Sequence, residues 1–152
     1  MREYMDTNTI LKQAIIQLNQ MIGHTFDVLQ LSKPISTAAA LNLLKIISKL
    51  SPLIGNLIEF NIVELLNKNN QFKDLGAWVR QDPGFPDAIF QGLIKPSPGF
   101  EIKAWFPLAT EITVRFKDSV NHFDNQNIYM VLIAWVPEYV TTVASSNHKI
   151  KE

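Results

Sequence analysis

The chain has 152 residues, of which 47% are hydrophobic and 18% are charged, and its 14 basic and 14 acidic side chains balance at pH 7. This composition is typical of a globular protein, and the length suits one domain, 1–152, with a single core. No apolar run approaches the ~20 residues that a membrane span needs. The lack of cysteine excludes disulfides and thiolate metal sites, and the first residues do not resemble a secretory signal, so we expect a cytoplasmic protein without a membrane partner.

The first part of the chain, 1–71, is predicted to be mainly helical. Apolar residues recur at helical spacing from Ile10 to Ile22, and two further helices are expected up to Leu50 and from Ser51 onward. The predicted N-caps are Asn8 or Thr9 for the first helix, Ser36 or Thr37 for the second and Ser51, followed by Pro52, for the third. The helical layer should therefore contain three helices.

Glu59 is the most informative residue of the third predicted helix. Its neighbours at helical spacing include Ile62 and Val63, so it lies on the apolar stripe, whereas Glu64 lies on the polar face. A half-buried carboxylate is costly unless it is paired, hydrogen-bonded or bound to a metal. Two interpretations stay open: Glu59 pairs with a nearby lysine or arginine, or it belongs to a metal site.

The second part, 72–143, is predicted to be mainly sheet. Strands are expected at 77–81, around Asp87, around Glu101, at 111–118 and at 128–136. The last run, IYMVLIAWV, is so uniformly apolar that we expect a central strand covered on both faces. Helices first and strands afterwards indicate an α+β fold, with N-terminal helices packed on a mixed sheet of four to five strands.

The segment 84–105, GFPDAIFQGLIKPSPGFEIKAW, contains the residues that indicate a catalytic site. Side chains alternate along a strand, so Glu101 and Lys103 project together from one face. The loop 91–99 is rich in proline and glycine and should return the chain antiparallel, which would bring Asp87 beside Glu101. Two carboxylates and a lysine could then surround one divalent metal ion. The alternative is a cross-strand salt-bridge cluster on a solvated sheet face.

The order of these pieces resembles the PD-(D/E)xK nuclease superfamily, and in its finer pattern the MutH group of mismatch-repair and restriction endonucleases. GNLIE at 55–59 matches the helix motif G-x-L-[LI]-E of that group, and PD at 86–87 followed by EIK at 101–103 matches its catalytic motifs. AWVPE at 134–138 matches the end of its apolar strand. The resemblance covers roughly residues 22–138 and implies a restriction-endonuclease-like fold.

The resemblance further implies a Mg²⁺-dependent endonuclease that hydrolyses phosphodiester bonds of double-stranded DNA. Asp87 and Glu101 would hold Mg²⁺, with the carbonyl group of Ile102 as a possible third ligand. Lys103 would position or help deprotonate the attacking water. Glu59 would complete the site through a metal-bound water or by orienting Lys103.

Four residues outside this centre are candidates for DNA contacts: Lys95, Trp105, Arg115 and Lys117. Lys95 lies in the loop between the two catalytic motifs, which are separated by thirteen residues, and Trp105 is in phase with Glu101. Arg115 and Lys117, like Arg80, are basic residues on predicted strands, where a solvated strand face is the alternative interpretation.

Nucleases of this group continue well past the apolar strand into a region that reads DNA sequence, whereas this chain ends at Glu152. We therefore expect the C-terminal DNA-reading region to be missing. A second hypothesis follows from this and from the neutral net charge. The chain would be a catalytically inactive nuclease-like module for DNA binding or assembly, working as a homodimer or completed by a partner polypeptide.

Overall fold

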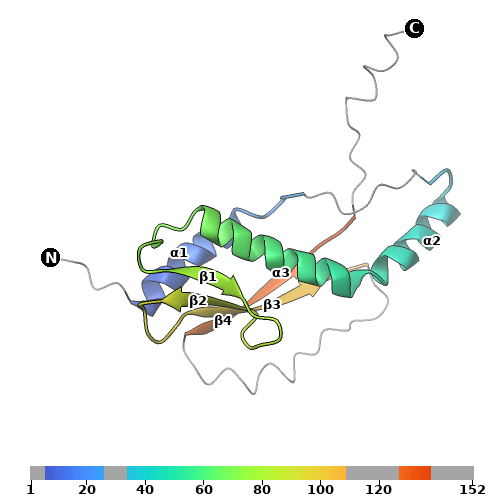
Figure 1. Cartoon of the computed structure of the whole chain (residues 1–152). Helices are drawn as coiled ribbons and strands as arrows, with labels where there is room; N and C mark the ends of the chain where they lie inside the picture. Colours follow the sequence, from blue (N-terminus) through green and yellow to red (C-terminus); the bar gives the residue numbers. More distant parts are fainter. Residues whose placement is uncertain (1–5, 26–33, 109–126, 138–152) are drawn as a thin grey trace, which may run out of the picture.

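The computed structural model describes residues 6–25, 34–108 and 127–137, and these form an α+β fold of three helices and a four-stranded mixed sheet (Figure 1). The elements are α1 (Thr7–Asn19), α2 (Thr37–Ser48), α3 (Ser51–Lys68), β1 (Gly76–Arg80), β2 (Ala88–Gly92), β3 (Gly99–Trp105) and β4 (Ile128–Ala134). The predicted α+β class is confirmed, with the described helices first and the described strands afterwards. The strand predicted at 111–118 lies outside the described residues.

The strands follow one another in the order β1-β2-β3-β4. β1 and β2 are antiparallel, β2 and β3 are antiparallel, and β4 runs parallel to β3. In this part of the chain β4 has a strand on one side only, and its Tyr129 and Leu132 are 42% and 61% exposed. The prediction of a strand covered on both faces is therefore wrong for these side chains, because an apolar run shows that a strand is apolar but not which of its faces is covered.

The core lies between α1, α3 and one face of the sheet. The strand residues on this face include Trp78, Phe90 and Phe100, and the Trp78 ring stacks on Phe100 with 5.1 Å between ring centroids. Ile102, two residues after Phe100, is 3% exposed and belongs to the same core. Aromatic rings contribute large buried areas, so these contacts fix α3 across the sheet.

The helix termini follow the sequence with two corrections. The first helix is capped by Asp6, whose side chain accepts a hydrogen bond from Thr9 N at 2.8 Å, rather than by Asn8 or Thr9. The second helix is capped by Ser36 as predicted. Ser51 lies inside α3 instead of capping it, because its hydroxyl group donates to Ser48 O at 2.7 Å.

Asn67 of α3 and Asn70, just after the helix, bind the outer edge of β1. The side chain of Asn67 accepts a hydrogen bond from Trp78 N and donates one to Trp78 O, each at 2.8 Å. Asn70 Nδ2 donates to Gly76 O at 2.9 Å. These bonds give the backbone groups of this edge the partners that a neighbouring strand would otherwise supply.

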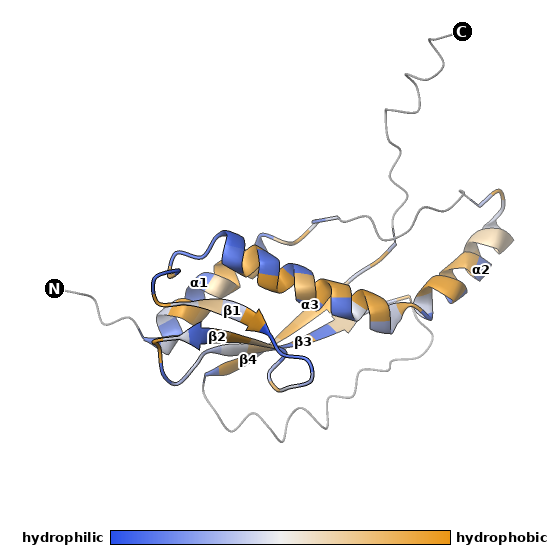
Figure 2. Cartoon of the chain, viewed as in Figure 1, coloured by the Kyte–Doolittle hydropathy of each residue, from blue (hydrophilic) through white to orange (hydrophobic). Residues whose placement is uncertain are grey.

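The helix α2 extends beyond the sheet and carries apolar side chains along much of its length (Figures 1 and 2). None of its residues is buried, and Leu41 and Ile46 are 56% and 58% exposed. In the described ranges no helix is by itself long and apolar enough to cross a membrane; only α2 and α3 taken together reach that length, and they are bent by 65° at their junction.

Candidate metal site at the start of β2

Asp87 is placed by a tight loop that joins β1 to β2. Gln81 closes this loop twice, with its backbone N–H donating to Asp87 O and its side-chain Nε2 donating to Pro86 O, both at 2.8 Å. Pro86 is buried against Gly99, where an added Cβ would lie 2.5 Å from Pro86 Cγ. Glycine at position 99 therefore permits the close approach that brings the Pro86-Asp87 pair onto β3.

Asp87 and Glu101 lie opposite each other at the start of β2. The antiparallel register pairs Ala88 with Phe100, so one residue further out Asp87 faces Glu101. Asp87 Oδ2 also accepts a hydrogen bond from Ile102 N at 2.6 Å. The predicted return of the chain, which brings Asp87 beside Glu101, is confirmed.

The environment of Asp87 disfavours its charge. The pKa of Asp87 is raised to about 6, mainly by burial and in smaller part by the negative charges of Glu101 and Glu59, while the hydrogen bond from Ile102 N and the charge of Lys103 act in the opposite direction. Glu59, Glu101 and Lys103 thus all act on one carboxylate. The four predicted catalytic residues therefore interact electrostatically through Asp87.

Glu101 is 6% exposed, and Lys103 Nζ donates a hydrogen bond to its Oε1. This ion pair is part of the salt-bridge alternative, but Glu101 is buried rather than on a solvated face. In the described part of the structure Lys103 contacts Glu101 and not Glu59. The main chain of Ile102 is held by its N–H group, which donates to Asp87.

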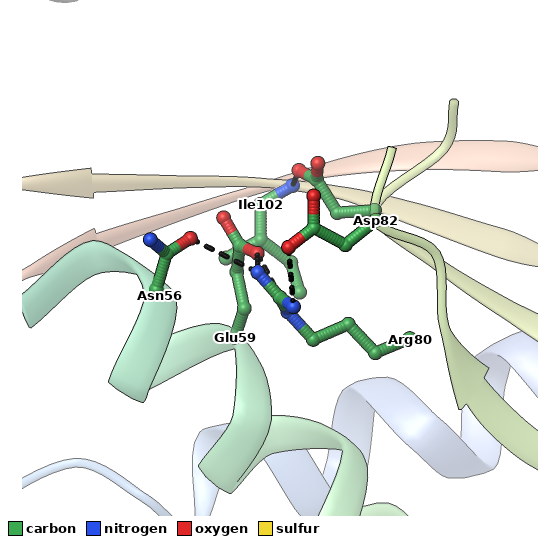
Figure 3. Close-up of polar contacts among 6 residues, drawn as sticks. Asn56, Glu59, Arg80, Asp82 and Ile102 are labelled. Carbon is green, nitrogen blue, oxygen red and sulfur yellow. Dashed lines mark hydrogen bonds and ion pairs between the residues drawn. The ribbon is translucent and has the colours of Figure 1, made fainter. Parts of the chain in front are cut away.

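Glu59 is bound by Arg80 of β1, a partner that the sequence interpretation missed (Figure 3). Arg80 Nη2 lies 2.9 Å from Glu59 Oε2, and Arg80 Nε donates to the same oxygen at 3.0 Å. Arg80 also donates to Asp82 Oδ2 and to Asn56 Oδ1, both at 2.9 Å. The interpretation in which Glu59 pairs with a basic residue is confirmed.

The DNA-contact candidates are not all near this site. Lys95 is exposed and hydrogen-bonds Ser97 in the loop after β2, whereas Asp87 comes directly before β2, so the two lie at opposite ends of this strand. Trp105 is 43% exposed at the end of β3, on the strand that carries Glu101. Arg115 and Lys117 lie outside the described residues.

The residues present fit a magnesium ion through two carboxylates. Asp87 Oδ1 and Glu101 Oε2 accept no hydrogen bond from the described residues. No three acidic or imidazole side chains in the described ranges are arranged to hold a metal by themselves. Mg²⁺ is typically held by one or two carboxylates together with water and substrate phosphate, which matches this pair.

No protein-family model, no curated protein and no solved structure matches this chain. Its function is therefore inferred from the residues and geometry of the site.

Proposed function

We propose that the protein is a Mg²⁺-dependent endonuclease that hydrolyses phosphodiester bonds of duplex DNA, with its centre at Asp87, Glu101 and Lys103. The observation that supports this most strongly is the half-buried carboxylate of Asp87, which faces a second buried carboxylate and has a pKa of about 6. Perturbed pKa values of this kind gather at functional sites.

The pairing of charges indicates where a cation would bind. Glu101 is paired with Lys103, and both Glu59 and Asp82 are paired with Arg80. Asp87 makes no ion pair within the described ranges, and two neighbouring carboxylates repel its charge. A divalent cation between Asp87 and Glu101 would relieve this repulsion, so these are the residues that would hold Mg²⁺.

The chemistry that Mg²⁺ supplies when bound is the polarisation of the scissile phosphate and a lowered pKa of a bound water. Lys103 Nζ, on the Glu101 side of β3, would orient the attacking water and offset negative charge on the phosphate. The Ile102 N–H group holds Asp87 Oδ2, so Oδ1 would be the oxygen of Asp87 that binds the cation. The carbonyl group of Ile102 stays a proposed further ligand.

The choice of DNA, and of a restriction or mismatch-repair type of reaction, depends on the resemblance to PD-(D/E)xK nucleases. The order of elements supports it, since α3 carries Glu59, β2 begins directly after Asp87, and β3 carries the pair Glu101 and Lys103 before the parallel strand β4. A nuclease-like single domain with a restriction-endonuclease-like fold is part of the same proposal.

The test is cleavage of supercoiled plasmid by the purified full chain in Mg²⁺ and in EDTA. We expect nicked or linear product in Mg²⁺ alone, and loss of at least 100-fold in rate for Asp87→Asn and Lys103→Gln, as for removal of a principal charge-stabilising group. Glu64→Gln is the control, because Glu64 is an exposed carboxylate on the same helix as Glu59. A folded wild type that leaves the plasmid intact at all Mg²⁺ concentrations would contradict the proposal.

The exposed apolar helix α2 favours a second candidate, an inactive nuclease-like module for DNA binding or assembly that another chain completes. Leu41 and Ile46 are more than half exposed, and exposed apolar surface is a feature of many interaction sites. Binding to a partner polypeptide that is lost in Leu41→Glu but unchanged in Asp87→Asn would select this candidate. Equal activity of wild type and Leu41→Glu on plasmid DNA would count against it.

A further inference from the structure

We propose that Arg80 is a positioning residue of the site, which holds the carboxylate of Glu59 in place for the proposed reaction. The inference rests on the proposed nuclease function, and it assigns a role to a residue outside the sequence motifs. Arg80 belongs to β1, whereas Glu59 belongs to α3, so their contact joins the helical layer to the sheet (Figure 3).

The geometry of the contact fixes Glu59 rather than merely neutralising it. Two different nitrogens of Arg80, Nε and Nη2, lie 3.0 and 2.9 Å from the same oxygen, Glu59 Oε2. The guanidinium group is itself fixed by Asn56 Oδ1 and Asp82 Oδ2, at 2.9 Å each. A planar group that donates to three acceptors has little freedom to rotate, so it also restricts the carboxylate of Glu59 that it binds.

This arrangement leaves the other oxygen of Glu59 available. Oε1 accepts no hydrogen bond from the described residues, and the side chain of Glu59 is 19% exposed. The charge of Glu59 also acts on Asp87. Arg80 therefore directs one oxygen of Glu59 into the guanidinium contact and leaves the second to orient a water molecule toward Asp87.

The same contacts argue against a role of Arg80 in binding DNA phosphate. All three of its nitrogens donate to protein oxygens, and its side chain is 25% exposed. Contact with a phosphate would require at least one of these bonds to break. Arg80 also lies two residues after the buried Trp78 on the same face of β1, which directs it toward α3 rather than toward solvent.

The test is a double-mutant cycle on plasmid cleavage by the full chain, with Arg80→Gln, Glu59→Gln and the double variant, at saturating Mg²⁺. If Arg80 acts through Glu59, each single variant lowers kcat by about 10- to 100-fold, and the double variant is no slower than Glu59→Gln. KM for DNA stays unchanged. Arg80→Lys recovers only part of the rate, since lysine restores the charge but not the planar fork.

Two controls separate positioning from other effects. Lys73→Gln removes an exposed positive charge from the loop after α3 and should leave kcat unchanged. Thermal unfolding reports whether each variant is folded. If Arg80→Gln does not fold, Arg80→Lys takes its place in the cycle. The inference would be overturned if the losses in kcat of the two single variants multiply in the double variant. It would also be overturned if Arg80→Gln raises the KM for DNA and makes DNA binding less dependent on salt. Either result would leave the nuclease function intact. No cleavage by the wild type would overturn both.

Discussion

Replacing Asp87 by asparagine should make the protein more stable at neutral pH and inactive at the same time. The asparagine side chain keeps an oxygen that can accept the hydrogen bond from Ile102 N, which Asp87 Oδ2 accepts at 2.6 Å. The substitution removes a half-buried negative charge that Glu101 and Glu59 repel. The hydrogen bond is thus retained while the unfavourable charge is lost.

The size of the effect follows from the pKa of Asp87, which rises from its ordinary value of 3.8 to about 6. Each pKa unit corresponds to about 1.4 kcal/mol, so complete burial would give about 3 kcal/mol. Asp87 is only half-buried and solvent screens its charge, which reduces the expected gain to about 1 kcal/mol. For a chain of this length that is a rise in Tm of about 2–4 °C.

The pH dependence gives the sharpest assay. Because the pKa of Asp87 is higher in the folded state than in the unfolded state, the folded state keeps the proton between the two values. The wild type should lose stability relative to Asp87→Asn as the pH rises from about 4 through about 6, with no further change above about 7. Denaturant unfolding at several pH values measures this difference.

The control for that series is Asp74→Asn, an exposed aspartate in the loop before β1. It should change the free energy of unfolding by less than about 0.5 kcal/mol at every pH. The reasoning is refuted if Asp87→Asn is less stable than the wild type near pH 8, or if the stability difference between them is the same near pH 5 and near pH 8.

Three further predictions concern other parts of the structure. Lys103→Gln leaves buried Glu101 without its ion-pair partner, so denaturant titration should show a loss of about 2 kcal/mol, and unchanged stability would contradict the pairing. Gly55→Ala should stabilise α3 by up to about 1 kcal/mol in thermal melts, since an added Cβ meets Ala104 Cβ at an ordinary 3.8 Å. Gly92→Ala should instead destabilise the protein, because its Cβ would lie 1.9 Å from Leu75 O. Asn67→Ala removes both partners of the Trp78 backbone and should cost about 2 kcal/mol; a loss below about 0.5 kcal/mol would show that water replaces them.

Much of the fold and the centre of the site follow from local patterns. The alternation along β3 predicts that Phe100 and Ile102 enter the core while Glu101 and Lys103 share the other face, and the structure has this arrangement. Proline and glycine between the strands predict the antiparallel return that brings Asp87 to Glu101. Such features depend on residues close in sequence, where side-chain period and turn chemistry decide the outcome.

The contact between Glu59 and Arg80 was not predicted because it depends on how α3 packs on β1, across 21 residues of sequence. A signal for it is present in the strand. Arg80 is in phase with Trp78, so if Trp78 enters the core, Arg80 must point toward the helical layer and needs an acidic partner there. The position of β4 at one end of the described sheet could not be predicted, because strand order is set by long-range packing that an apolar run does not encode.

The bonds from Asn67 and Asn70 to β1 also bear on how this protein avoids aggregation. An unprotected edge strand is a template on which another chain can add by backbone pairing. Here the N–H and C=O groups of Trp78 already have a side-chain partner in Asn67 of α3, and the C=O group of Gly76 has one in Asn70, just after the helix. A foreign strand would have to break these three bonds before it could join the sheet at β1. Asn67 and Asn70 therefore protect this edge from domain swapping and fibre growth.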